Sequence, residues 1–376
     1  MSLGTASLPT RPVDPPRSAG PAIRIMIVDD SAIIRGLIAR WLTEAGGFEI
    51  VGTAANGRLA VEAVRRVKPD IVLMDIEMPE MDGMTALPLL LKAQSGIKVI
   101  VISTLTQRNA EVSLKCLSLG AVDYLAKPES TRIAGSSADF RRDLIDKLRA
   151  LGGAKPRPRI AAAPTSNSAT TSLRISPALV PARPECLVIG SSTGGPRAVE
   201  RVLVDLGPAL KQLPVLIVQH MPPMFTAVFA EHLQSLVSVP SREARDGDPL
   251  LPGTILVAPG GRHMGLSMSG GKPSIRLSDG PAENFCRPAV DVLFRDAAAA
   301  FGPAALAVVL TGMGSDGTEG ARALVKAGAP VIVQDETSSI VWGMPGSIAK
   351  AGLAREILPL EAIGPSLRNM ITGPAK

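Results

Sequence analysis

A serine inside a glycine-rich turn is the first feature of this sequence that suggests chemistry. Ser192 is the central residue of GSSTG at 190–194, which fits the pattern G-x-S-x-G and starts where the apolar run 186–190 ends. In that pattern the serine stands on a tight strand-to-helix turn with small neighbours, so that a substrate can approach it. A glycine-rich turn into a helix is also an anion site. The motif alone leaves a nucleophile, a phosphate-binding loop and a structural turn open.

A serine nucleophile needs a histidine base and an acid that orients the base. The chain has three histidines, and His220 directly follows the apolar run 214–219. Asp316 lies in GMGSDG, after the apolar run 305–312. Ser192, His220 and Asp316 therefore stand at the ends of three predicted strands, and we interpret them as a catalytic triad.

The remaining histidines and one cysteine offer alternatives. His232 falls in a predicted helix over 223–236 and is expected on the surface, whereas His263 follows a Gly-Gly loop, where it could line a pocket or be structural. Cys286 is the competing nucleophile. The sequence places no base beside it, and buried cysteines are usually inert packing. We therefore favour Ser192.

Carboxylates gather at the ends of apolar runs nearer the N-terminus. Asp29 and Asp30 follow one run, Asp75 and Ser103 end two others, and Lys127 follows a fourth. Three such acids are either solvated loop residues or a Mg²⁺ site, since hard cations take oxygen ligands. A hydroxyl and a lysine across the same edge would suit a phosphoryl group.

The elements that carry these carboxylates alternate between short apolar runs and amphipathic stretches, which is typical of β-α units. Five units over residues 23–151 predict a five-stranded doubly wound parallel sheet, in which ligands lie at the carboxyl ends of the strands. The predicted strands are 23–28, 49–54, 70–75, 98–103 and 121–126, and the predicted helices are 31–45, 57–67, 83–94, 107–119 and 137–151.

A second α/β pattern follows over residues 186–370. It predicts another doubly wound, mostly parallel sheet with an antiparallel hairpin excursion at 264–280. The predicted strands are 186–190, 214–219, 254–259, 305–312 and 330–335, and the predicted helices are 196–206, 223–236, 288–300 and a segment that ends near 327.

Residues 152–185 separate the two patterns and have the composition of a flexible linker, rich in Pro, Ala, Ser and Thr. They are strongly basic, and residues 1–22 read as a disordered tail. The net charge of +6 is therefore concentrated in the tail and the linker. Two near-neutral domains joined by a basic linker argue against a nucleic-acid partner.

The composition of the chain also argues against several other classes of protein. Aromatic residues make up 3% of the chain, which argues against a stacking platform for single-stranded nucleic acid. No apolar run reaches the roughly 18 residues of a membrane span, and residues 1–22 lack the apolar centre of a secretion signal. The three cysteines are widely spaced without CxxC, so no zinc site or disulfide framework is indicated. We expect a cytoplasmic protein without membrane insertion.

Residues 23–150 resemble the receiver domain of two-component response regulators, through VDDS, VLMDIEMPEMDG, VIVIS and LAKP. The resemblance implies that Asp75 is the phosphoacceptor and that Mg²⁺, required for phosphorylation, is bound by Asp29, Asp30, Asp75 and the Glu77 backbone carbonyl. It further implies a switch hydroxyl at Ser103, a switch aromatic at Tyr124 and a phosphoryl partner at Lys127.

Residues 186–365 resemble the catalytic domain of chemotaxis receptor methylesterases, the CheB family. The matching segments are IGSSTGGP, VQHMP, APGGRHM, RPAVDVLF and LTGMGSDG, in this order. The resemblance implies Ser192 as nucleophile, His220 as general base and acid, Asp316 as the orienting carboxylate, and the Met313 N–H as an oxyanion donor. Thr193 follows the nucleophile, where a second oxyanion donor is expected. The motif register favours Ser192 over the adjacent Ser191.

The two resemblances together imply a phosphorylation-activated esterase. Its substrate would be a glutamate methyl ester on chemoreceptors, with deamidation of receptor glutamines as a second activity and no cofactor for the hydrolysis. The implied partners are the methyl-accepting receptors and a chemotaxis histidine kinase, and we expect a monomer. The unphosphorylated receiver is expected to cover the esterase cleft.

Two rival output functions fit less well. A DNA-binding regulator needs a helix-turn-helix with a basic recognition face, whereas residues 186–376 are near neutral and rich in buried strands. A nucleotide-binding loop at 190–196 would need an acid about 20 residues further on. Asp205 is too near for that spacing and lies within a predicted helix.

Overall fold

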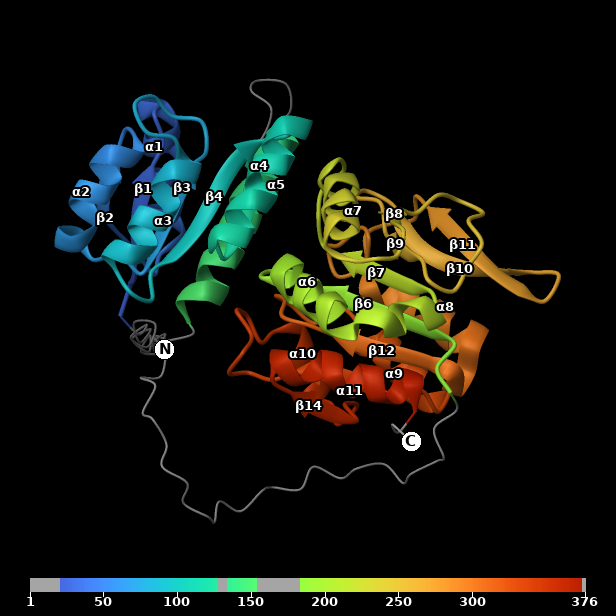
Figure 1. Cartoon of the computed structure of the whole chain (residues 1–376). Helices are drawn as coiled ribbons and strands as arrows, with labels where there is room; N and C mark the ends of the chain where they lie inside the picture. Colours follow the sequence, from blue (N-terminus) through green and yellow to red (C-terminus); the bar gives the residue numbers. More distant parts are fainter. Residues whose placement is uncertain (1–20, 128–133, 154–182, 374–376) are drawn as a thin grey trace, which may run out of the picture.

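The structure is a computed structural model, and it describes residues 21–127, 134–153 and 183–373. Nearly all of the predicted N-terminal tail and linker lies outside the described residues. The described chain forms two α/β units, each built on its own parallel sheet (Figure 1).

The first unit is a five-stranded sheet with the order β2-β1-β3-β4-β5, in which every neighbouring pair is parallel. This order confirms the predicted doubly wound receiver fold. Its strands are β1 (Ile23–Val28), β2 (Phe48–Ala54), β3 (Ile71–Asp75), β4 (Lys98–Thr104) and β5 (Asp123–Lys127), and its helices are α1 (Ala32–Ala45), α2 (Gly57–Val67), α3 (Gly83–Ala93), α4 (Gln107–Leu119) and α5 (Ala134–Gly152).

Local sequence explains where these helices begin. Four of them start behind a side chain that accepts a hydrogen bond from a backbone N–H in the first turn, which satisfies an otherwise unpaired donor. Strand β3 is buried throughout and β1 over its last four residues, as expected for a parallel sheet covered on both faces. The four capping residues are Ser31, Asn56, Asp82 and Thr106.

The second unit is a seven-stranded sheet with the order β14-β13-β12-β6-β7-β9-β8, and all of its neighbouring pairs are parallel. Its strands are β6 (Cys186–Ser191), β7 (Val215–Gln219), β8 (Ser241–Glu243), β9 (Ile255–Val257), β12 (Ala305–Val309), β13 (Val331–Gln334) and β14 (Glu356–Leu358). Its α-helices are α6 (Gly195–Leu206), α7 (Phe225–Leu236), α8 (Val290–Phe301), α9 (Thr318–Lys326), α10 (Met344–Lys350) and α11 (Leu360–Thr372), and the 3₁₀ helices are η1 (Gly207–Gln212) and η2 (Gly302–Ala304).

The predicted hairpin excursion is present as β10 (His263–Ser269) and β11 (Lys272–Ser278), which pair antiparallel. The two strands form a separate sheet that packs on α8. The edge strands β8 and β14 were not predicted from the sequence, because each has three residues and neither is fully buried. Helix α11 was not predicted either, and it runs two residues past the predicted domain end at 370.

The switch in strand order falls between β12 and β6. The chain runs from β6 outward through β7 to β8 and β9, and then returns to the other side of β6 as β12. Ligands of open α/β sheets bind beyond the carboxyl ends of the strands at such a point. The segments that follow β6, β7 and β12 therefore define the candidate site.

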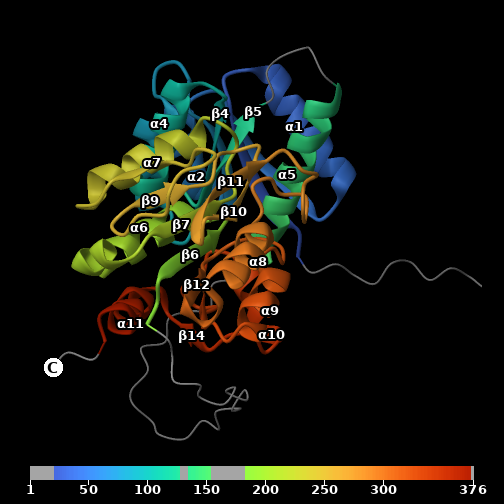
Figure 2. The ribbon, with the colours of Figure 1, turned by 90° about the vertical axis from the view of Figure 1, so that its right-hand side faces the viewer.

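The two units pack against each other through α4 and β5 of the first and α6, α7 and the turn before α6 of the second (Figures 1 and 2). Helix α4 contacts both α6 and α7. None of the helices within the described ranges is long and apolar enough to cross a membrane.

Candidate active site

The structure brings His220 and Asp316 together at the switch point. His220 Nε2 lies 2.8 Å from Asp316 Oδ2. The Asp316 carboxylate also accepts hydrogen bonds from three backbone N–H groups, which hold it in one orientation. These donors are Val290 at 2.7 Å, Asp291 at 3.0 Å and Gly317 at 2.9 Å.

These contacts shift the pKa values of the pair in opposite directions. Burial alone would raise the pKa of Asp316, but the hydrogen bonds from His220 and from the backbone hold it below its ordinary value. Burial alone would lower the pKa of His220, but the hydrogen bonds to Asp316 and to the nearby Cys286 raise it above its ordinary value. The site therefore stabilises an imidazolium, the form that a general base takes in mid-reaction.

Ser192 lies at the turn between β6 and α6, and the carbonyl of the adjacent Ser191 accepts a hydrogen bond from His220 N–H at 3.1 Å. The Ser192 backbone is fixed by hydrogen bonds from its N–H to Thr311 O and from Gln219 Nε2 to its carbonyl oxygen. Its hydroxyl makes no hydrogen bond to any described residue. A β-carbon at Gly312 would stand 2.9 Å from Ser192 Cβ, so the close approach of the β12 loop requires glycine there.

The neighbouring Ser191 is placed differently. It is fully buried, and its hydroxyl donates to Gln219 Oε1 at 2.6 Å. A buried hydroxyl that already has a partner is poorly suited to attack a substrate. This placement supports the expected register, because Ser192 is only half-buried whereas Ser191 is fully buried.

Two backbone N–H groups flank Ser192 without a protein acceptor. Neither Thr193 N–H nor Met313 N–H donates a hydrogen bond to another described residue. Free amides beside a nucleophile are what an oxyanion hole requires. Thr193 and Met313 are the two residues that the motif and the family resemblance implied as oxyanion donors.

The other two histidines have structural contacts. His263 is buried and uses both ring nitrogens: Nδ1 accepts from Ala289 N–H, and Nε2 lies 2.9 Å from Pro281 O. His232 is half-buried, and its Nε2 lies 3.1 Å from Glu200 Oε1. We assign neither residue to the chemistry.

Cys286 has a neighbour that was not predicted from the sequence. Its Sγ lies 3.5 Å from His220 Nδ1, so a base does stand beside this thiol. The sequence carried no signal for this contact, because it depends on a turn between β11 and α8 that folds back onto the site.

The carboxylates of the first unit also meet at one sheet edge. Asp75 is buried, and its Oδ2 lies 2.7 Å from Lys127 Nζ, which is also 2.9 Å from Asp29 Oδ2. Burial, partly offset by Lys127, raises the pKa of Asp75 to about 6. Ser103 Oγ lies 2.9 Å from Ser113 Oγ on α4, so the predicted switch hydroxyl has a partner on the helix.

This edge suits a hard divalent cation. Carboxylate oxygens of Asp29, Asp30 and Asp75 lie within 4.8 Å of one another. Asp29 Oδ2 is buried without a properly oriented hydrogen bond, although it is close to Lys127. A cleft of about 460 Å³ next to them is lined by Asp30 and Glu77. Oxygen-only donors of this kind fit Mg²⁺.

A buried polar contact joins the first unit to the nucleophile turn. Thr193 Oγ1 donates to Asp123 Oδ2 at 2.8 Å, and Lys147 Nζ lies 2.8 Å from the same oxygen. Next to it, the Tyr124 ring stacks on Phe225 with a centroid distance of 4.6 Å. Neither Asp123 nor Lys147 was predicted as a site residue from the sequence.

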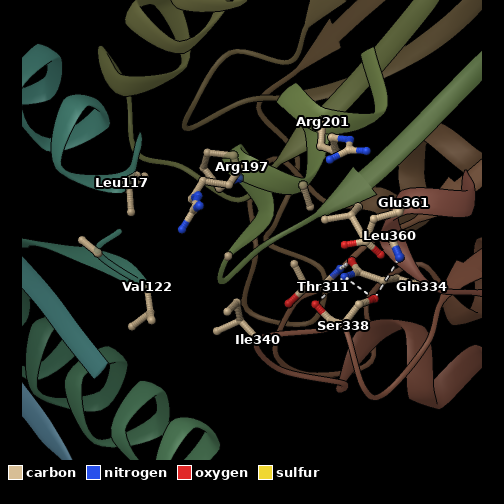
Figure 3. A pocket seen from close by; sticks show the side chains of 14 residues that line it. Leu117, Val122, Arg197, Arg201, Thr311, Gln334, Ser338, Ile340, Leu360 and Glu361 are labelled. Atoms are coloured by element: carbon tan, nitrogen blue, oxygen red, sulfur yellow. Dashed lines mark hydrogen bonds between the residues drawn. The ribbon is translucent and has the colours of Figure 1, made fainter. Parts of the chain in front are cut away.

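Apolar residues extend the same interface. Met313, Ile340 and Val341 of the second unit join a hydrophobic cluster of the first. Next to them the interface leaves a pocket of about 290 Å³, with Leu117 and Val122 on one side and Arg197 on the other (Figure 3). Packing between the units is therefore tight around the nucleophile turn and looser beside it.

Together these features define a response regulator with an α/β output domain that carries a Ser-His-Asp constellation. Residues 25–134 match the response regulator receiver domain, and residues 187–367 match the CheB methylesterase domain. The chain belongs to the CheB family of receiver-linked methylesterases.

Individual relatives cover almost the whole chain. The protein-glutamate methylesterase/protein-glutamine glutaminase of Rhodopseudomonas palustris (strain HaA2) is 49% identical, over 93% of this chain and 95% of its own. The group 2 operon enzyme of Bradyrhizobium diazoefficiens is 47% identical, over 95% of this chain and 96% of its own. The crystal structure of the Thermotoga maritima CheB methylesterase catalytic domain is similar with 39% identity and a TM-score of 0.48, over 50% of this chain and 98% of that domain.

Proposed function

We propose that this chain hydrolyses γ-glutamyl methyl esters on the cytoplasmic helices of chemoreceptors, and that phosphorylation of its receiver domain activates it. The same site would deamidate receptor glutamines, with ammonia in place of methanol as the leaving group. The observations that carry the proposal are the hydrogen-bonded His220–Asp316 pair and the hydroxyl of Ser192, which has no partner among the described residues and lies on the turn whose Ser191 carbonyl accepts from His220 N–H.

In the proposed reaction Ser192 Oγ attacks the ester carbonyl while the imidazole of His220 takes its proton. The Nε2 atom faces Asp316, so Nδ1 is the ring nitrogen left to serve the nucleophile. His220 then gives the proton to the leaving methoxide. Water, deprotonated by His220, cleaves the acyl-enzyme and releases glutamate.

The negative charge on the carbonyl oxygen would be stabilised by the N–H groups of Thr193 and Met313. In well-studied hydrolases, loss of one such donor costs about 2.7–4 kcal/mol of transition-state stabilisation. Because the Thr193 side chain is bound to Asp123, the receiver domain contacts one of the two proposed donor residues directly.

Phosphorylation would take place at Asp75, with Mg²⁺ held by Asp29, Asp30, Asp75 and the Glu77 carbonyl, and with Lys127 beside the phosphoryl group. The bound cation would offset the charge of the carboxylates and of the phosphoryl oxygens. The phosphodonor would be a chemotaxis histidine kinase. We expect the chain to act as a monomer.

The signal would pass from Asp75 to the interface through Ser103 and Tyr124. Movement of Ser103 toward a phosphoryl group would break its contact with Ser113 on α4. Tyr124 would then leave its stack on Phe225, and the receiver would separate from the nucleophile turn.

Methanol release from methylated receptor membranes, with and without acetyl phosphate, tests the proposal. We expect release that rises with acetyl phosphate and Mg²⁺. No release from methylated receptors under either condition would refute the assigned activity, whereas release without stimulation would refute the gating.

A further inference from the structure

A cysteine thiol and an imidazole nitrogen face each other in the candidate active site, and the proposed hydrolysis does not use the thiol. Cys286 Sγ lies 3.5 Å from His220 Nδ1. In a tetrahedral zinc site, Zn–N bonds of about 2.0–2.1 Å and Zn–S bonds of about 2.3 Å place the two ligand atoms about 3.5 Å apart. The observed separation matches this spacing.

The far side of the imidazole is already arranged as it is in zinc proteins. A histidine that binds a metal usually directs its other ring nitrogen to a carboxylate, which fixes the ring and strengthens the ligand. His220 Nε2 makes this contact with Asp316, at 2.8 Å. Asp316 is itself held by backbone N–H groups, so the ring cannot turn freely.

The turn that carries Cys286 is held in place by several contacts. Glu283 and Cys286 exchange two backbone hydrogen bonds, and Arg295 Nη2 donates to both carboxylate oxygens of Glu283. Asn284 adopts a positive φ of 52° and donates to Asp291. The thiol is therefore positioned by the fold, and it is partly exposed to solvent.

We propose that Cys286 Sγ and His220 Nδ1 form a binding site for a borderline-soft divalent cation, Zn²⁺, and that its occupation inhibits the esterase. Thiolate and imidazole favour such a cation over Mg²⁺, which takes oxygen ligands. Water would complete the coordination. Binding would release the thiol proton and occupy the lone pair that otherwise accepts the proton of Ser192.

Zinc binding can be measured on the full chain without any assay of activity. Binding is measured by equilibrium dialysis with Zn²⁺ in excess Mg²⁺. The Asp75→Asn background and the excess Mg²⁺ limit binding of Zn²⁺ to the receiver carboxylates. We expect one Zn²⁺ per chain, and an affinity about tenfold or more lower in Cys286→Ala. A Cys116→Ala/Cys186→Ala double variant retains the proposed ligand and should bind normally.

Two further measurements remain informative even if the Cys286→Ala variant does not fold. With Co²⁺ as the probe, the unmodified chain should show a thiolate-to-cobalt charge-transfer band, and Cys286→Ala should not. Zn²⁺ should also protect Cys286 of the unmodified chain from alkylation. The proposed zinc site would be wrong if the Zn²⁺ affinity were unchanged in Cys286→Ala, or if Zn²⁺ did not protect Cys286 from alkylation.

Inhibition is tested separately as the ratio of activity with Zn²⁺ to activity with a chelator, measured within each variant. The ratio should be well below one for the unmodified chain and close to one for Cys286→Ala. Equal ratios would overturn the inhibitory role. Because the dialysis needs no catalysis, a failure of the proposed esterase function would be distinguishable from a failure of the metal site.

Discussion

Asp123 of the receiver accepts a hydrogen bond from the hydroxyl of Thr193, the residue that follows Ser192 in the nucleophile turn. The contact is buried, and Lys147 balances the charge of the carboxylate. One receiver side chain is thus bound to the segment that carries the proposed nucleophile and one proposed oxyanion donor. The receiver therefore contacts the turn that carries Ser192 directly, in addition to covering the path by which a substrate would reach it.

Replacing Asp123 by alanine should raise the activity of the unphosphorylated chain. A hydrogen bond to a charged group contributes about 1.5–3 kcal/mol, so its loss would shift the closed–open equilibrium by about tenfold or more. Methanol release without acetyl phosphate measures the change. Asp146→Ala, on α5 but outside these contacts, is the matched control. Equal rates for the two variants would show that the contact does not hold the closed state.

Ser192→Ala should abolish methanol release, by about 10⁴-fold or more on the precedent of other serine triads. Ser191→Ala should retain most of the activity and lose about 1 kcal/mol of folding stability, because it removes the buried hydrogen bond to Gln219. Kinetics and thermal unfolding of both variants separate the two effects. If Ser191→Ala were the inactive variant, the register would be wrong.

Much of the fold was predictable because parallel strands and their helices leave a strong local pattern. The helices at 57–67 and 107–119 have the predicted bounds, since each begins behind a capping side chain and ends with its amphipathic pattern. The edge strand β14 was not predictable. Three residues that are only partly buried show no run of apolar side chains.

The candidate site also contains some residues that could be predicted from the sequence and others that could not. His220 and Asp316 could be placed because each follows a buried strand, and parallel strands bring such positions to one edge. The positions of Cys286 and Asp123 depend on how a loop and a whole domain pack against that edge. No periodicity in the sequence encodes those contacts, so their neighbours could only be found in the structure.

Phosphorylation of Asp75 by acetyl phosphate should depend on pH. Burial, opposed by Lys127, raises the pKa of this carboxyl from 3.8 to about 6. The attacking form is the carboxylate, so the rate should fall as the pH decreases through about 6. Saturating Mg²⁺ favours the carboxylate and should move this decline to lower pH. A rate in low Mg²⁺ that stays constant down to pH 5 would contradict the raised pKa.

The same site gives a simpler test of the acceptor. Asp75→Asn should lose labelling by a small phosphodonor and should lose stimulation of methanol release, while its basal rate should remain that of the unphosphorylated chain. The amide keeps the size of the side chain but is a much weaker nucleophile. Undiminished labelling would locate the phosphoacceptor elsewhere.

A fragment that begins at Pro184 should release methanol faster than the unphosphorylated full chain. In the full chain, Asp123 binds the nucleophile turn, and Met313 packs in a cluster with receiver residues. The activation that phosphorylation can reach is limited by the population of this closed state, so the fragment should set its upper bound.

The comparison requires equal concentrations, the same methylated receptors and a check that the fragment unfolds cooperatively, because removal of the receiver uncovers Phe225. A fragment slower than the unphosphorylated full chain would reject simple occlusion. The contact between Asp123 and Thr193 would then have to be read in the opposite sense, as one that helps to orient the N–H of Thr193 toward the oxyanion.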